Sequence, residues 1–189
     1  MSASPHDFNK KMEFFLDLHR SYLFRIYLFN TGINIASTAQ AILITNLISQ
    51  SAVPSSRSDE ISIGWEGTNV KIAGKRTYGD WKCTIRSDHL NVATNYFSKW
   101  SRQIYDYETG SSKFINNAFR GGYKKTALVR LLGSGNVLDS MVGYKEYMLY
   151  GVWPKEIGEM TLDYTSETVL TFPVTFSVDY WIESSFLDI

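Results

Sequence analysis

The 189-residue sequence has few of the residues that most often carry chemistry. It contains one cysteine, Cys83, so an intrachain disulfide is excluded, and a lone cysteine is typical of folding in a reducing compartment. Its alternating surroundings indicate a small core residue rather than a nucleophile. The histidines, His6, His19 and His89, lack the cysteine or carboxylate spacing of a zinc or iron site, so we expect them to be structural or solvated.

Motifs of catalysis are missing as well. Gly133-Ser134-Gly135 lacks the remainder of a nucleotide-binding fingerprint, and Ser134 does not stand in a GxSxG elbow, so this stretch indicates a turn. Sequence alone does not give the separations among the carboxylates that acid–base catalysis would use, of which the candidates are Asp80, Asp88, Asp163 and Asp179. We expect no enzymatic activity, no cofactor and no metal.

The chain has no excess of charge and no long apolar run. Its 19 basic and 19 acidic residues cancel, which argues against strong non-specific binding to nucleic acid or to anionic membranes. A net charge of zero also removes the repulsion that keeps monomers apart. Charged residues interrupt the N-terminal apolar region, so it is neither a secretory signal nor a spanning helix. We expect a protein that stays soluble in the cytoplasm where it is made and does not insert into membranes.

Aromatic residues, by contrast, make up 15% of the chain and favour strands. Alternating or wholly apolar segments separated by turn residues predict strands, with a hairpin around Glu66-Gly67-Thr68. We therefore predict a mainly β fold, an antiparallel two-sheet sandwich or barrel. Serine-rich residues 49–59 and residues 108–122 have loop composition. The segments predicted as strands are 22–29, 41–45, 61–65, 69–73, 81–86, 123–132, 137–153, 160–164 and 169–181.

The last of these strands, VLTFPVTFSVDYW at 169–181, has one dry face. Proline donates no ladder hydrogen bond, so Pro173 predicts either a bulge or a sheet edge, at which another chain could pair. The alternative is an ordinary hairpin strand in a monomeric sandwich. The residues that share the apolar face are Leu170, Phe172, Val174, Phe176, Val178 and Tyr180.

Two segments have helical periodicity. Behind Asp7, apolar residues recur at helical spacing over about 7–19 and predict a short helix that covers the core or docks on a neighbouring copy. A flanking helix over about 89–107 follows the capping residues Ser87 and Asp88. Its apolar stripe consists of Leu90, Ala93, Phe97, Trp100, Ile104 and Tyr107.

Three ordered stretches carry a family resemblance: KIAGKRTYGDW at 71–81, YKKTALVR at 123–130, and YGVWPKEIGEMTLDY at 150–164, which leads on to DYW at 179–181. Over roughly residues 20–181 this combination resembles the tail tube protein of T4-like contractile-tailed bacteriophages. The departures from the pattern divide the chain into an N-terminal extension at 1–20, a tube domain at 21–181 and a C-terminal tail at 182–189.

The resemblance implies a non-enzymatic virion protein. Copies would form hexameric rings, stacked into a hollow tube through which the genome is delivered, with strands of neighbouring subunits joined in one barrel around the lumen. The implied partners are further copies of the chain, the sheath protein, a tape-measure protein, the baseplate or tube initiator, the tail terminator and, transiently, DNA. Because DNA must pass, we expect threonine, serine and acidic groups to line the lumen.

Residue roles follow as hypotheses. Trp81, Trp153 and Trp181 are expected to pack in the core and to set strand register, with a place at a subunit interface as the alternative. Arg76 and Asp80 could form an ion pair, within a subunit or across the ring. The loops that contain Arg57 and Lys113 are candidates for contacts between rings. The remaining candidate residues for contacts between subunits are Pro173 and Asp179, both in the final strand.

Other functions remain open from sequence. The same architecture would serve as the tube of a contractile injection device that carries protein cargo, or as a tube initiator at the baseplate. A monomeric β-sandwich binding module would need an exposed aromatic patch or a pocket. An enzyme would need a cluster of titratable groups in a cleft.

Overall fold

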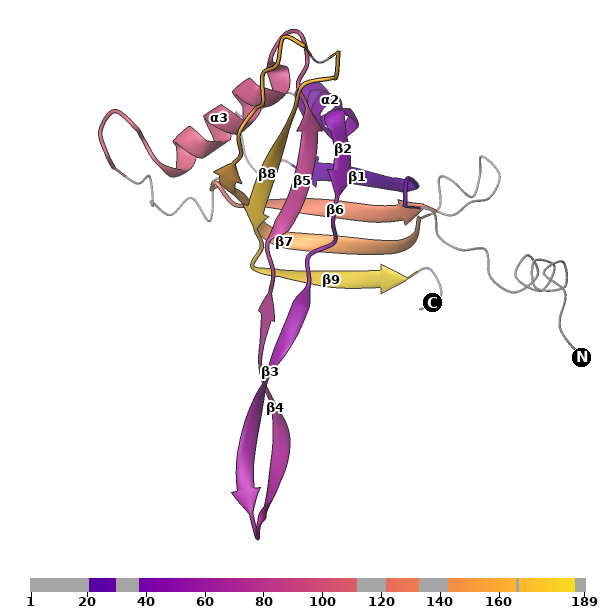
Figure 1. Ribbon diagram of the computed structural model, residues 1–189, viewed down its shortest axis with the longest axis vertical. Coiled ribbons are helices and arrows are strands. Elements are labelled where there is room, and N and C mark those ends of the chain that lie inside the picture. The colour runs from indigo at the N-terminus through magenta and orange to yellow at the C-terminus, as the bar shows by residue number, and fades with distance from the viewer. Residues whose placement is uncertain (1–20, 30–37, 112–121, 133–142, 166, 186–189) are drawn as a thin grey trace, which may run out of the picture.

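The computed structural model describes residues 21–29, 38–111, 122–132, 143–165 and 167–185. The fold is mainly β, as the sequence predicts, with two helices in the described part (Figure 1). The helices are α2 (Thr38–Leu47) and α3 (Val92–Ile104). The strands are β1 (Phe24–Phe29), β2 (Ile48–Ser51), β3 (Ser56–Trp65), β4 (Thr68–Tyr78), β5 (Trp81–Arg86), β6 (Lys125–Leu132), β7 (Gly143–Ile157), β8 (Thr171–Ser177) and β9 (Tyr180–Ser185).

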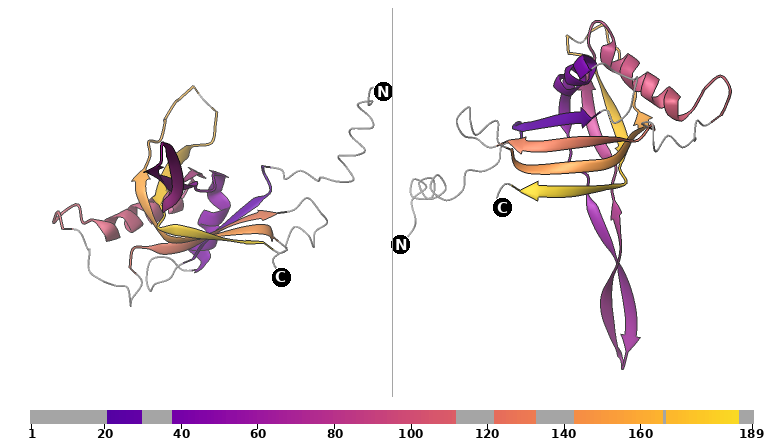
Figure 2. Two further views of the ribbon diagram at one scale, coloured as in Figure 1. Left: turned by 90° about the horizontal axis from the view of Figure 1, so that it is seen from below. Right: turned by 180° about the vertical axis from the view of Figure 1, so that it is seen from behind.

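One antiparallel sheet of seven strands forms the body, with the order β1-β6-β7-β8-β5-β2 and β9 on the free side of β7. Strand β7 belongs to both halves of this sheet: its first part pairs with β6 and β9, and residues 153–157 pair with β8. Between these parts Gly151 has a φ of 67°, which glycine adopts without steric cost. The chain therefore turns a corner at Gly151, and the two halves run in different directions (Figures 1 and 2).

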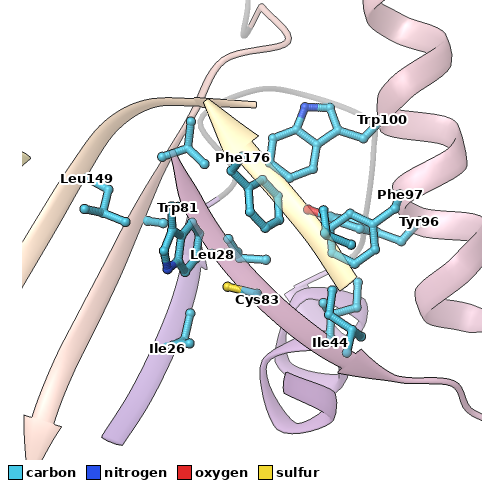
Figure 3. Packing of buried hydrophobic residues seen from close by; sticks show 14 of the residues in the cluster. Ile26, Leu28, Ile44, Trp81, Cys83, Tyr96, Phe97, Trp100, Leu149 and Phe176 are labelled. Carbon is cyan, nitrogen blue, oxygen red and sulfur yellow. The ribbon is translucent and has the colours of Figure 1, made fainter. Parts of the chain in front are cut away.

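The core lies where the two halves of the sheet meet the helices (Figure 3). Trp81 is completely buried and stacks on Phe176 with ring centroids 4.9 Å apart. Its indole Nε1 donates a hydrogen bond to Ser51 Oγ at 2.9 Å, so this large core side chain leaves no polar atom unpaired. Cys83 is buried beside them, and burial raises the pKa of its thiol to about 12. This confirms Cys83 as an inert core residue.

Helix α3 covers the core with one face, as its periodicity predicts. Ala93, Phe97 and Trp100 are buried, but the helix spans 92–104, so Leu90 and Tyr107 lie beyond its ends and are exposed. Asp88 caps it by accepting the backbone N–H groups of Val92 at 3.0 Å and Ala93 at 3.1 Å. Partial burial acts to raise the pKa of Asp88, but these backbone hydrogen bonds lower it below its ordinary value.

A two-stranded hairpin, β3–β4, forms a separate sheet that projects from the body and that we call the arm (Figures 1 and 2). Every residue of β3 is exposed, and so is every residue of β4 except Gly74 and Tyr78. The predicted turn at Glu66-Gly67 is confirmed, with a positive φ at both residues. At the base of the arm, the ring of Tyr78 meets Trp181 of β9 edge to face at 5.9 Å.

Several sequence predictions were wrong in their boundaries or type. Residues 41–45 belong to α2, because a run of four apolar residues does not distinguish a buried helix from a strand. Most of the expected loop 49–59 is strand, in β2 and in β3 at the base of the arm. Strand β7 runs past the predicted end at 153 to Ile157, the predicted part before Gly143 lies outside the described residues, and residues 160–164 form no strand.

The expected long strand at 169–181 is two strands, β8 and β9, separated at Val178-Asp179. Its dry face is confirmed at Phe172, Val174 and Phe176. Strand β8 lies inside the sheet between β7 and β5, so the edge that Pro173 predicted is not there. The bulge lies instead in β7, between Pro154 and Glu156. The N-terminal helix predicted at 7–19 falls outside the described residues.

Candidate assembly surfaces

The half of the sheet made of β1, β6, β7 and β9 has an unpaired edge on each side, at β1 and at β9. Each strand is antiparallel to the next, so β1 and β9 run in opposite directions. Both edge strands therefore present backbone N–H and C=O groups that pair with no described strand. An incoming strand β9 from a second copy would meet β1 in the same antiparallel sense that holds throughout the sheet.

The two faces of this four-stranded half differ. One face is in the core, where Ile26, Val129 and Leu149 are buried with side chains from α2 and α3. The opposite face carries a cross-strand row of mainly apolar side chains, in which each residue pairs with the next: Tyr27, Leu128, Met148 and Ile182.

A second row on that opposite face is polar. Arg25 pairs with Arg130, which pairs with Glu146. Arg130 Nε and Glu146 Oε1 are 2.6 Å apart, in an ion pair whose side chains are about one third exposed. Arg130 also lies over the ring of Tyr27, 5.7 Å from the ring centroid. The opposite face thus combines apolar and paired charged groups.

Asp179 holds the corner of the sheet. Its backbone N–H donates to Tyr150 O at 3.0 Å, and both of its carboxylate oxygens accept from Lys124 Nζ at 2.7–2.8 Å. A Cβ on Gly151 would lie only 2.0 Å from Asp179 Oδ2, so only glycine is accommodated there. This cluster joins the second stretch of the family resemblance, through Lys124, to the third stretch and its continuation, through Gly151 and Asp179. Neither Lys124 nor Gly151 was singled out from sequence, because the cluster depends on contacts between distant segments.

The arm has one apolar face. Because side chains alternate along a strand, Ile61, Ile63 and Trp65 of β3 share that face with Val70 and Ile72 of β4. Ile61 pairs with Ile72 and Ile63 with Val70, and all are about half exposed or more. Two-stranded hairpins are marginal alone in water, and large exposed apolar patches are typical of contact sites, so this apolar face is a candidate contact surface.

A buried lysine, also missed from sequence, supports β6. Lys125 is 3% exposed, and its Nζ donates to Tyr96 Oη at 2.9 Å and lies 4.1 Å from the centroid of the Trp100 ring. Burial lowers the pKa of Lys125 to about 8 and raises the pKa of Tyr96 to about 12. The sequence signal was only a lysine near the start of a predicted strand, a residue type that is usually exposed.

The three tryptophans singled out from sequence have different environments. Trp81 is fully buried, whereas Trp153 and Trp181 are half-buried. The ring of Trp153 meets Tyr123 at 6.0 Å, and that of Trp181 meets Tyr147 at 5.5 Å. The core role therefore holds for Trp81. Trp181 lies on the edge strand β9, where a role in subunit contact stays a prediction.

The charged candidates are separated in this structure. Asp80 Oδ2 accepts from Lys155 Nζ at 2.8 Å, and no ion pair joins Arg76 to Asp80 among the residues described. A pair across the ring stays a prediction. Arg57 lies at the base of the arm, with its Nε 3.9 Å from Asp59, and its side chain is largely exposed. Lys113 lies outside the described residues.

Across the described ranges, no group of three or more potential ligands is arranged to hold a metal ion. None of the helices in those ranges has the length and apolar character needed to cross a membrane. The features that stand out are the open sheet edges and the arm. Together they define the class of the protein as a structural protein that associates with further copies of itself.

Comparison with known proteins shows to which family of structural proteins the chain belongs. The model of the phage tail tube protein family matches residues 11–184. Tail tube protein gp19 of Enterobacteria phage T4 is 29% identical over 166 residues, which are 87% of this chain and 91% of gp19. The chain therefore belongs to the phage tail tube protein family, a family of structural proteins of the virion.

Solved structures share the fold. The tube-terminating cap of the anti-feeding prophage has a TM-score of 0.61 and 13% identity, with 89% of this chain and 91% of that chain covered. A chain in the six-fold symmetrised baseplate of the anti-feeding prophage has a TM-score of 0.57 and 14% identity, with 98% of each chain covered. At such identities the comparison concerns architecture alone.

Proposed function

We propose that this chain forms the tail tube by closing hexameric rings, with β9 of each copy pairing antiparallel with β1 of the next. The observation that carries the proposal is the four-stranded half-sheet with two free edges of opposite direction. Rotation about one axis then joins the half-sheets into a single barrel that has no unpaired edge. Ring closure satisfies the backbone groups that a monomer leaves exposed on β1 and β9.

In such a ring the opposite face of the four-stranded half-sheet turns to the lumen. The helices, β8, β5 and β2 lie on the core side, which is too bulky to occupy the inside of the barrel. The lining therefore includes Arg130, Met148 and Ile182 beside the serine, threonine and acidic groups expected from sequence. The paired charges keep its net charge low, which suits passage of DNA without strong binding. A tape-measure protein, displaced before the genome leaves, would occupy the same lumen during assembly.

The arm, on this proposal, joins one ring to the next. Its apolar face is exposed in the single chain, and it projects beyond the body along the longest axis of the molecule (Figure 1). A contact between an arm and a different surface of the next copy is heterologous and need not close, so rings continue as a filament. The expected contacts with sheath, baseplate and terminator would use surfaces at the outside and ends of that filament.

Electron microscopy of the purified chain over a concentration series, with the mass of the soluble fraction measured alongside, tests both steps. We expect six-fold rings that stack into hollow tubes, if necessary only after purified baseplate is added as a platform. A chain that stays monomeric even with that platform would contradict ring closure.

Two matched arm variants separate stacking from ring closure. Ile63→Asp places a charge on the apolar face of the arm, and we expect rings but no tubes, because burial of an unpaired carboxylate is costly. Ser62→Asp places the same charge on the other face of the same strand and should still form tubes. If both variants form tubes of normal length, the arm does not join rings through its apolar face.

A further inference from the structure

The segment between β7 and β8 forms a second exposed apolar surface, which we call the crown. Its described residues are 158–165 and 167–170. Leu162 is 81% exposed, Val169 is 66% exposed and Tyr164 is completely exposed, so the chain itself covers none of these side chains. A hollow of about 590 Å³ opens among them, lined by both limbs of the crown and by the first residue of β8. Exposed apolar side chains around a hollow are typical of a contact site.

The crown and the arm lie at opposite ends of the molecule. Figure 1 shows the crown at the upper end of the longest axis and the arm at the lower end, and the view from behind in Figure 2 agrees. The backbone N–H of Ser87 donates to Leu170 O at 2.8 Å, which joins the crown to the loop before α3, where Leu90 is also exposed. A chain with a different apolar surface at each end can join further copies by one heterologous contact.

The crown is acidic. It contains three carboxylates, those of Glu159, Asp163 and Glu167, and no lysine, arginine or histidine. The structure shows no ion pair for any of them within the ranges it describes. The backbone N–H and the hydroxyl of Thr165 donate to Asp163 Oδ1 at 2.8 and 2.7 Å, and these hydrogen bonds lower the pKa of Asp163 below its ordinary value. A surface that complements the crown would therefore be apolar and carry cations.

The arm fits that description. Lys71 Nζ and Glu60 Oε1 are 3.0 Å apart, so these two charges of the arm compensate each other. Lys75 and Arg76 are exposed and form no ion pair with any residue that the structure describes. The acidic Glu66 lies apart from them, at the turn. The arm thus combines an apolar face with two uncompensated cations.

We propose that the crown receives the apolar face of the arm from a copy in the adjacent ring; this inference rests on the role in stacking proposed above for the arm. An apolar side chain of the arm enters the hollow, and the contact covers Leu162, Tyr164 and Val169. Lys75 and Arg76 face the carboxylates of the crown, which fixes the orientation of the contact. Each ring then has arms on one side and crowns on the other, so every added ring presents the same free surface and the tube continues to grow.

Two matched tyrosine substitutions test the crown. Tyr164→Asp should give rings of normal mass that form no tubes, because burial of a further carboxylate among apolar and acidic groups is costly. The far-ultraviolet circular dichroism should not change, since Tyr164 is fully exposed in the single chain. Tyr107→Asp makes the same change at an exposed tyrosine beyond the end of α3, outside the crown, and should form tubes. Leu162→Asp, a second crown variant, should behave like Tyr164→Asp.

Mixing two variants tests whether the arm is the occupant of the crown. Rings of the Ile63→Asp variant have an altered arm and an intact crown, whereas rings of the Tyr164→Asp variant have an intact arm and an altered crown. Each should remain as single rings. An equal mixture of the two kinds of ring, formed separately, should give stacks of two rings and no longer stacks, because one intact arm surface and one intact crown surface are available for each pair. Electron microscopy counts the rings in each stack.

The outcomes separate this inference from the proposed function. Tubes formed by Tyr164→Asp, rings without tubes from Tyr107→Asp, or a mixture that remains as single rings would overturn the crown assignment. The role of the arm, judged by Ile63→Asp alone, would still stand. Tubes formed by Ile63→Asp would instead overturn the role of the arm in stacking, and this inference with it.

Discussion

The body and the arm are made from similar residues. In the body other segments of the chain bury the apolar side chains, whereas in the arm these side chains stay exposed. In the body, alternating strands such as β5 bury every second side chain, and Trp81 is wholly enclosed. In the arm, β3 alternates in the same way, yet Trp65 is 66% exposed. Alternation shows that a strand has a dry face, but it does not show whether the chain itself or another copy covers that face. If the arm joins rings, as proposed above, its apolar face is covered by another copy of the chain and not by the chain that carries it.

A pair of tryptophan substitutions tests this contrast with the largest expected effect. Trp81→Ala should lower the free energy of unfolding by about 3–5 kcal/mol, because it removes a buried ring and leaves a cavity. Trp65→Ala should change monomer stability by no more than about 0.5 kcal/mol and should impair tube formation. Urea unfolding of each monomer, with microscopy of the assembled sample, gives both readouts. A large loss of stability in the Trp65 variant would mean that the arm packs within its own chain.

Gly151→Ala tests the corner that divides the body. The positive φ costs a non-glycine residue about 1–3 kcal/mol, and the close approach of Asp179 adds to that cost. We expect a loss of stability of at least this size in urea unfolding. Gly67→Ala, at the tip of the arm, also has a positive φ but meets no atom within 4 Å, so it should cost less. Equal losses of stability in the two variants would show that the positive φ alone, and not the contact with Asp179, sets the cost of the substitution.

The Lys125→Met variant tests the burial of a lysine in the body through the pH dependence of stability. The pKa of Lys125 is about 8 in the folded chain and 10.5 ordinarily, so protonation disfavours the folded state. Stability of the unaltered chain should rise from pH 8 to pH 10.5, and the advantage of the variant should shrink by about 3 kcal/mol over that range. The pKa of Tyr96, about 12, lies above this window. A constant difference between the two chains across these pH values would contradict the burial argument.

Of these substitutions, Lys155→Met should have the smallest effect on the stability of the chain. Its ion pair with Asp80 is about half exposed, and the hydrogen bond that Lys155 Nζ donates to Asp80, together with the smaller effect of the negative charge of that carboxylate, raises the pKa of Lys155. Exposed pairs contribute little to stability because water and salt screen them. We expect a urea midpoint unchanged within error at 0.15 M salt. A clear shift would indicate that this pair is covered, for example by a neighbouring subunit.

Local patterns predicted the elements whose partners are close in sequence or whose periodicity is long. The arm turn at Glu66-Gly67 and the buried stripe of α3 are determined by a few consecutive residues, and both are confirmed. The same reasoning mistook part of α2 for a strand, because four apolar residues suit either conformation. It also predicted β8 and β9 as one strand, because no local signal at Val178-Asp179 shows that the next strand pairs elsewhere in the sheet.

The sequence by itself determined the mainly β class and, through its ordered motifs, the tail tube family. Only the tertiary structure decided which strands are edges, because an edge is defined by a missing neighbour and not by a residue type. It likewise brought Gly151, Asp179 and Lys124 together from positions far apart in the chain. Periodicity is a property of consecutive residues, whereas pairing, corners and open edges depend on contacts between segments far apart in the chain.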